Sequence, residues 1–81
     1  MENIRSIKIV HNGYKIEYAK TMEEVEAYIN TVITPYKHLN PERICDKIVS
    51  RNDKKKQHTK LIRIRYSTIY EETFILDINY Y

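Results

Sequence analysis

The strongest constraint on this chain is the pair Asn12-Gly13, which lies between two runs of alternating apolar and polar residues. Asn and Gly tolerate the positive φ angles of a type I′ turn, whose twist matches that of two antiparallel strands. Gly13 is the only glycine in the chain. The segment SIKIVHNGYKIEYA therefore predicts a β-hairpin over residues 6–19.

A two-residue loop in this hairpin would gather the larger apolar side chains on one face. The expected pairs on that face are His11 with Tyr14, Ile9 with Ile16 and Ile7 with Tyr18. On the opposite face, the same register places Lys8 beside Glu17 as a cross-strand pair of opposite charge. Tyr14 and Tyr18 are therefore expected in the core.

Residues 21–34, TMEEVEAYINTVIT, predict an amphipathic helix. Thr21 and Glu24 have the spacing of a capping box, and glutamates crowd the first turns, where the helix dipole favours anions. Apolar side chains recur at helical spacing. They are Met22, Val25, Ile29 and Val32, with Tyr28 and Ile33 widening the stripe. Pro35 is expected to end the helix and to move Thr34 out of the helical region.

The segment NPERICDKIVS, residues 40–50, has two interpretations. Asn40 and Pro41 resemble a helix start, and Ile44 and Ile48 are four residues apart, which favours a short second helix. The alternative is that the segment runs extended into the basic residues that follow, so that those residues form the tip of a hairpin. The helix is the preferred prediction.

The segments KLIRIRYSTIY and TFILDINYY predict two further strands. A three-residue loop at residues 71–73 would pair Tyr70 with Phe74, Thr68 with Leu76 and Tyr66 with Ile78. This register gathers Ile62, Ile64, Tyr66, Phe74, Leu76 and Ile78 on one side and Arg63, Arg65 and Asp77 on the other. The expected fold is α+β: two β-hairpins form a small antiparallel sheet covered by one amphipathic helix, with or without a second short helix.

A chain of 81 residues is expected to form one domain, residues 1–81, with a core that is small for an independent monomer. Such domains often gain stability from a staple or a second subunit. Cys45 is the only cysteine, so no internal disulfide can form, and a lone thiol without a signal-peptide pattern predicts a cytoplasmic location. Apolar runs are only a few residues long, so no membrane partner is expected.

The net charge of +3 comes from one segment. Residues 1–49 are neutral overall, residues 50–60 carry +4, and residues 61–81 carry −1. Such a cluster can neutralise phosphates and give salt-sensitive nucleic-acid binding, although lysine-rich loops are more often simply solvated. The candidate nucleic-acid-binding residues are Arg51, Lys54, Lys55, Lys56, Lys60, Arg63 and Arg65.

Catalytic and metal-binding patterns are missing from the sequence. The three histidines and Cys45 do not have metal-ligand spacing, and the glutamates are explained by a helix start and a turn. One glycine cannot build a phosphate-binding loop. We therefore expect no cofactor, no metal and no enzymatic activity.

The tyrosines suggest self-association instead. An aromatic ring with a polar tip suits a protein interface, and Tyr70, Tyr80 and Tyr81 lie at predicted element ends. They are the candidate dimer-interface residues. The sequence thus predicts a non-enzymatic homodimeric interaction module, with sequence-independent nucleic-acid binding through residues 50–60 as the alternative and a host protein as another possible partner.

The first hairpin, the capped segment TMEEVEAYINTVI and the terminal FILDINYY together resemble the Yopt family of small uncharacterised proteins encoded by a Bacillus prophage. This resemblance implies a homodimer of mixed helix and strand with no assigned activity. It also implies one helix and three strands per protomer, whereas the residues themselves predict four strands and up to two helices. No functional residue carries over from the family.

Overall fold

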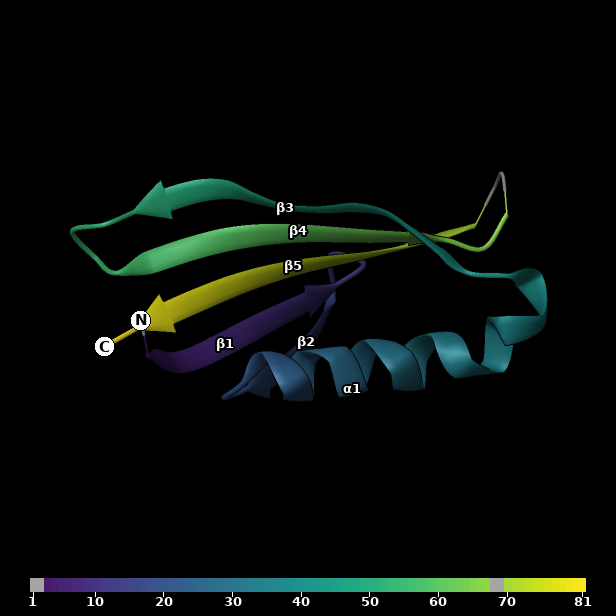
Figure 1. Cartoon of the computed structure of the whole chain (residues 1–81), viewed down its shortest axis with the longest axis horizontal. Coiled ribbons are helices and arrows are strands. Elements are labelled where there is room, and N and C mark those ends of the chain that lie inside the picture. Colours follow the sequence, from purple (N-terminus) through teal and green to yellow (C-terminus); the bar gives the residue numbers. More distant parts are fainter. Residues whose placement is uncertain (1–2, 68–69) are drawn as a thin grey trace.

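The computed structural model describes residues 3–67 and 70–81, which form a five-stranded antiparallel sheet with one α-helix on one face (Figure 1). The strand order is β2-β1-β5-β4-β3. The elements are β1 (Ile4–His11), β2 (Lys15–Ala19), α1 (Met22–Ile33), the 3-10 helix η1 (Thr34–Leu39), β3 (Glu42–Asn52), β4 (Gln57–Arg65) and β5 (Glu71–Tyr80). The predicted α+β fold is confirmed, with one strand more than expected.

The sheet is long, and the helix covers only part of it. The molecule measures 41 × 25 × 20 Å, and its radius of gyration is 13.2 Å, whereas a compact domain of 81 residues has about 12 Å. The α1 helix runs along the β1 and β2 side, and β3 forms the opposite edge (Figure 1). No element of the described residues covers the other face of the sheet.

The first hairpin forms where Asn12-Gly13 predicts it, and these residues have φ angles of 53° and 79°. Its register, however, differs by one residue, because His11 pairs with Lys15 and the loop contains three residues. A shift by one residue turns every side chain of a strand to the other face. The predicted inward positions of Tyr14 and Tyr18 are therefore wrong, and both rings are exposed.

This register changes the partners on both faces of the hairpin. Ala19, rather than Tyr18, lies opposite Ile7 in the core. A small residue suits this place because the chain turns into α1 directly afterwards. Lys8 lies opposite Tyr18, so the predicted pair with Glu17 does not form.

The helix α1 begins as predicted. The Thr21 hydroxyl accepts a hydrogen bond from the Glu24 N–H at 3.1 Å, and Val25 and Ile29 are buried. The end of the helix differs from the prediction, because Thr34 keeps helical φ and ψ angles of −54° and −44°. Pro35 lies in the first turn of η1, where the N–H that proline lacks has no helical partner to lose.

The helix predicted for residues 40–50 is wrong, and the extended alternative is confirmed by β3. Two bulges, between Arg43 and Cys45 and between Ile48 and Ser50, interrupt its pairing with β4. Each bulge inserts a residue and breaks the alternation by which a strand is recognised. Asn40 adopts the left-handed conformation, with φ of 54°, and ends η1 instead of starting a new helix.

The second predicted register is also wrong, but its faces are correct. Strand β4 ends at Arg65, which pairs with Glu71, and Phe74 lies opposite Ile62 rather than Tyr70. Likewise, Ile78 lies opposite His58 rather than Tyr66, and Leu76 lies opposite Lys60 rather than Thr68, which is outside the described residues. The observed partner of Phe74, Ile62, precedes the predicted partner, Tyr70, by eight residues. A register shift by an even number of residues keeps each side chain on its predicted face.

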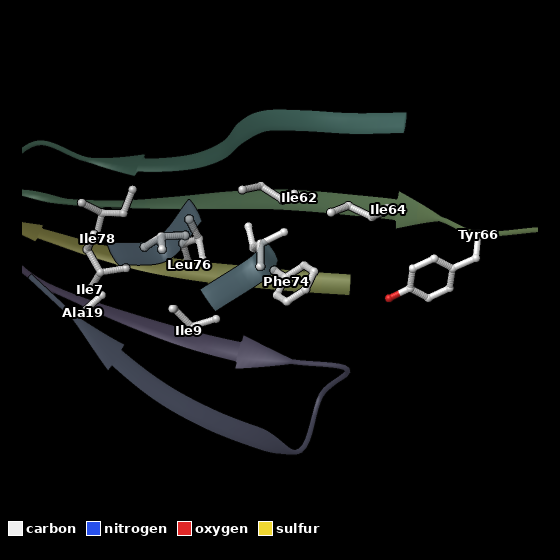
Figure 2. Packing of buried hydrophobic residues seen from close by; sticks show 11 residues of the cluster. Ile7, Ile9, Ala19, Ile62, Ile64, Tyr66, Phe74, Leu76 and Ile78 are labelled. Atoms are coloured by element: carbon white, nitrogen blue, oxygen red, sulfur yellow. The ribbon is translucent and has the colours of Figure 1, made fainter. Parts of the chain in front are cut away.

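The core lies between α1 and one face of β1, β4 and β5 (Figure 2). All six inward residues predicted for the last two strands are buried. They are Ile62, Ile64, Tyr66, Phe74, Leu76 and Ile78, and they pack with Ile7, Ile9, Ala19, Val25 and Ile29. Full inaccessibility to solvent is shared by residues of α1 and of all three strands, so the centre of the core lies between them; these residues are Ile7, Val25, Ile62, Phe74 and Leu76.

A network of charged side chains joins α1 to the strands at the far edge of the sheet. Arg43 on β3 donates two hydrogen bonds to Glu26 on α1, at 2.9 and 2.7 Å. Asp46 accepts from Arg43 at 3.0 Å and from Lys60 at 2.9 Å. The network therefore ties a strand that α1 does not cover to the helix.

The ion pair predicts a specific dependence of stability on pH. The hydrogen bond from Arg43 lowers the pKa of Glu26 below its usual value of 4.5. Because the pKa is lower in the folded than in the unfolded chain, this stabilisation is present above about pH 4.5 and is lost as pH falls through the folded-state pKa. In an Arg43→Gln variant, we expect the pKa of Glu26 measured by NMR to rise toward 4.5 and acid unfolding to become less steep. An Arg5→Gln variant, in which an exposed cation on β1 is removed, should leave the pKa of Glu26 unchanged. If both variants behave alike, the pair does not determine this pKa.

Candidate functional site

The basic segment forms the tip of the β3–β4 hairpin. Arg51, Lys54, Lys55 and Lys56 are all exposed there. The tip has a defined conformation, because the side-chain oxygen of Asn52 accepts from the Lys55 N–H at 3.1 Å. The structure therefore brings four of the seven candidate nucleic-acid-binding residues together.

The C-terminal tyrosines lie beside this tip. The Tyr80 N–H donates to the backbone oxygen of Lys56 at 2.8 Å. The Tyr80 ring packs on His58, with 4.8 Å between ring centroids, and Tyr81 is 74% exposed. An exposed aromatic ring thus borders the basic residues.

The other three candidate cations are not part of the tip. Lys60 is paired with Asp46, and Arg63 forms an ion pair with Glu71. Arg65 lies at the far end of β4, about 25–30 Å along the strand from the tip. The structure does not bring Lys60, Arg63 and Arg65 into one surface with the hairpin tip.

The three tyrosines predicted for a dimer interface also lie apart. Tyr70 precedes β5, whereas Tyr80 is the last residue of this strand and Tyr81 follows it, about 30 Å away along the strand. Tyr80 packs against the core. These residues do not form one contiguous surface.

The uncovered face of the sheet, which we call the open face, carries an apolar row. Val10 lies opposite Ile16 on one side and opposite Ile75 on the other, and Ile75 lies opposite Leu61. We call these four residues the apolar stripe. The stripe crosses β2, β1, β5 and β4. Ile16 and Ile75 are exposed, and Val10 and Leu61 are half-buried.

Charged residues around the stripe are balanced. Lys8 and Asp77 lie opposite each other on β1 and β5. Arg63 pairs with Glu71 through its guanidinium, which lowers the pKa of that carboxyl. The open face therefore combines an apolar centre with cations and anions in close proximity, unlike the cationic tip.

A buried polar cluster lies on the other face, at the end of the sheet near η1. His11 is buried and stacks on Phe74 with 4.7 Å between ring centroids. Its Nδ1 is 3.2 Å from the Tyr28 hydroxyl. Its Nε2 donates a hydrogen bond to Glu72, because an ionised carboxylate can only accept. Asn12 donates to the same Oε2 of Glu72 at 2.6 Å. The first turn of the chain thus fixes a carboxylate located sixty residues later.

Glu72 is also part of the wall of a pocket. The pocket has a volume of about 420 Å³ and is lined by Tyr36, Leu39, Tyr66, Tyr70 and Glu72. The rings of Tyr36 and Tyr66 are in contact, with 4.8 Å between centroids. Three aromatic rings and one carboxylate therefore surround a single cavity between η1 and the start of β5.

The Tyr66 hydroxyl is the unusual group in this pocket. Tyr66 is only 7% exposed, and among the described residues its hydroxyl has no hydrogen bond of normal geometry, although it lies close enough to Glu72 to interact with that carboxylate. Its ring lies beyond Phe74 at the end of the core, with the oxygen directed back toward it (Figure 2). Burial, together with the nearby Glu72 carboxylate, raises the pKa of Tyr66, so the group stays a neutral phenol.

The sequence did not reveal this site. A turn is a sufficient explanation for Glu71 and Glu72 in the sequence, as it is for Asn12 in the first hairpin. The sequence does place His11 at the end of the hairpin with its side chain toward the core, and this prediction is confirmed. Its partner Glu72 follows only from the register of β5.

The described residues provide neither a metal site nor a membrane span. Across residues 3–67 and 70–81, no three His, Cys, Asp or Glu side chains lie close enough to hold a metal ion. Neither helix in these ranges has the length and hydropathy needed to cross a bilayer. Cys45 is a free, half-buried thiol on β3 rather than on a helix.

Comparison with known proteins finds no similar protein. No protein-family model matches the chain, no curated protein is significantly similar to it, and no solved structure matches its fold. The resemblance to the Yopt family stays a prediction.

Proposed function

We propose that this protein is a non-enzymatic interaction module that forms a homodimer through the open face of its sheet. The observation that carries this proposal is the apolar stripe on a face that neither helix of the described chain covers. An antiparallel sheet with one solvated face normally carries polar residues there. A second sheet packed on the stripe, about 10 Å away, would remove these side chains from water.

The size of the exposed surface supports a second copy as the occupant. The protomer of 9.8 kDa exposes 5796 Å², whereas a monomeric protein of this mass exposes roughly 5,200 Å². The excess of roughly 600 Å² approaches the ~800 Å² that each partner buries in a standard interface.

The charges around the stripe also suit self-association. In a two-fold symmetric interface the same surface meets itself, so a face of one charge sign would repel its copy. The neighbouring Lys8 and Asp77 avoid this repulsion. Pairing through the β3 edge is less favourable, because its two bulges interrupt the backbone donors and acceptors that a new strand would need.

Sedimentation equilibrium of the purified protein tests the proposal. From micromolar to millimolar concentration, we expect the mass to reach twice the 9.8 kDa of the protomer. The association should change little with salt, because it depends on apolar contact rather than on unpaired charge. A mass that stays at one protomer over this range would contradict the proposal.

Nucleic-acid binding through the hairpin tip is the second candidate. The specific observation in its favour is that Arg51 and three consecutive lysines are exposed at a tip whose Lys56 is bonded to Tyr80, the residue before the exposed Tyr81. Lysine and arginine bind phosphates with a strong salt dependence, and an exposed aromatic ring can stack on a base. Dimerisation would place two such tips on one particle.

Charge reversal at the tip separates the two candidates. We expect the triple variant Lys54→Glu, Lys55→Glu and Lys56→Glu to abolish binding to a mixed-sequence DNA duplex, because the phosphate contacts are lost. Fluorescence anisotropy at low and moderate salt measures the loss, and thermal unfolding should be little changed since these side chains are exposed. A matched triple variant at exposed lysines outside the tip and the stripe, Lys15→Glu, Lys20→Glu and Lys37→Glu, should retain more of the binding. Equal losses would mean that net charge, and not the tip, is responsible.

A further inference from the structure

We propose that the pocket lined by Tyr36, Tyr66, Tyr70 and Glu72 binds a guanidinium group, presented by an arginine side chain of a partner polypeptide. We call it the tyrosine pocket. It lies on the helix side of the sheet, away from the apolar stripe, so the inference is independent of how two copies associate.

The charge of the pocket selects a cation. Glu72 is the only charged residue among the described residues of its wall. The bonds from His11 and Asn12 both go to Oε2, so Oε1 is the atom toward which a ligand N–H can be directed. These two donors also hold the carboxylate in place before a ligand arrives, which lowers the entropic cost of binding.

The aromatic walls favour a planar cation. The faces of tyrosine rings attract cations, and a guanidinium stacks on them more readily than a strongly hydrated ammonium. Tyr36 and Tyr66 already contact each other, and Tyr70 also lines the cavity. A flat group can stack on these rings with its edge toward Glu72.

The Tyr66 hydroxyl supplies a reason for a cation with several N–H donors. It is buried near the Glu72 carboxylate without a hydrogen bond of normal geometry among the described residues, and it remains a neutral phenol that can accept a hydrogen bond. An unpaired buried polar group is costly, so a ligand that pairs with it gains affinity. A guanidinium has five donors and can serve Tyr66 and Glu72 together, whereas a quaternary ammonium has none.

The size of the pocket suits a whole side chain. Its volume of about 420 Å³ is within the range of ligand sites, roughly 300–1,000 Å³. A bare ammonium would leave most of this space unfilled. The methylene groups of an arginine can contact Leu39 and the tyrosine rings while the guanidinium reaches the carboxylate.

Peptide titration tests the proposal. The probes are acetyl-Gly-Arg-Gly-amide, the same peptide with the neutral isostere citrulline, the same peptide with lysine, and free argininamide. Binding is followed by calorimetry and by NMR of the Tyr36, Tyr66 and Tyr70 rings. We expect the arginine peptide to bind at least about tenfold more tightly than the citrulline peptide and more tightly than the lysine peptide. Equal binding of the arginine and citrulline peptides would overturn the proposal. Binding of argininamide without binding of the peptide would overturn the assignment to a polypeptide.

Three variants locate the binding. Glu72→Gln keeps the acceptor for His11 but removes the charge, so affinity for the arginine peptide should fall at least about tenfold. Glu71→Gln, a change one residue away on the other face, should leave it unchanged. Tyr66→Phe should weaken binding severalfold while leaving thermal stability equal or higher, because it removes a buried unpaired hydroxyl. Unchanged affinity in Glu72→Gln or in Tyr66→Phe would contradict the proposed contacts.

Discussion

Replacement of Phe74 by alanine is expected to lower the free energy of unfolding by about 3–5 kcal/mol, the usual cost of deleting a fully buried aromatic side chain. Phe74 has no exposed surface and lies at the centre of β5, the central strand of the sheet. It stacks on His11 and meets the edge of Tyr28 from α1. Its loss would therefore loosen the sheet, the helix and the Glu72 cluster together.

The expected loss of stability is large relative to the total free energy of unfolding. Domains of 81 residues have a total stability of about 4–12 kcal/mol, so much of the Phe74→Ala protein should be unfolded near 37 °C. Urea unfolding at a fixed protomer concentration measures the difference, because dimerisation makes stability concentration-dependent. Tyr14→Ala is the matched control, an aromatic truncation at a ring that is 80% exposed, and should change stability by less than about 0.5 kcal/mol. A Phe74→Ala cost below about 1.5 kcal/mol would mean that the core is not built around this ring.

An Ile75→Lys variant is expected to weaken the homodimer at least about 100-fold, or about 2.7 kcal/mol. Ile75 is next to Phe74 in the sequence but points to the open face, where it occupies the middle of the apolar stripe. In a two-fold interface, each protomer would present the new ammonium group to the other near the symmetry axis. Removing both charges from water, close to each other, costs more than the lost apolar contact alone.

The variant is chosen so that the protomer survives. Ile75 is 37% exposed, and a lysine there can extend to solvent in the monomer. Val49→Lys is the control, because Val49 is also an exposed apolar strand residue but lies outside the stripe on β3. Sedimentation equilibrium should show monomers for Ile75→Lys and dimers for Val49→Lys. If Val49→Lys separates the protomers and Ile75→Lys does not, the interface is at the β3 edge.

The sequence predicts strand faces better than strand pairs. In β4 and β5 the predicted register was wrong by eight residues, yet the buried set was right, because the error was even. In the first hairpin an error of one residue placed Tyr14 and Tyr18 in the core. Alternation alone does not reveal whether a turn contains two or three residues, and that number decides which face of β2 is buried.

The helix predicted for residues 40–50 is wrong for a different reason. Its two bulges remove the alternation, and the spacing of Ile44 and Ile48 then imitates a helix. Strand β3 is stabilised by pairing with β4 and by the ion pair of Arg43 with Glu26, neither of which is visible in a local window. The tyrosine pocket is missed on the same ground, because Tyr36 and Tyr66 are thirty residues apart and meet only in the folded chain.

The most direct test of the central claim is an isotope-filtered NMR experiment on a mixture of ¹³C-labelled and unlabelled protomers. It detects only contacts between two copies. We expect intermolecular NOEs between methyl groups of Ile75 and those of Val10 or Leu61, because the proposed interface brings the two stripes together. Intermolecular NOEs confined to another surface, or none at concentrations where the stripe should be paired, would contradict a homodimer formed through the open face.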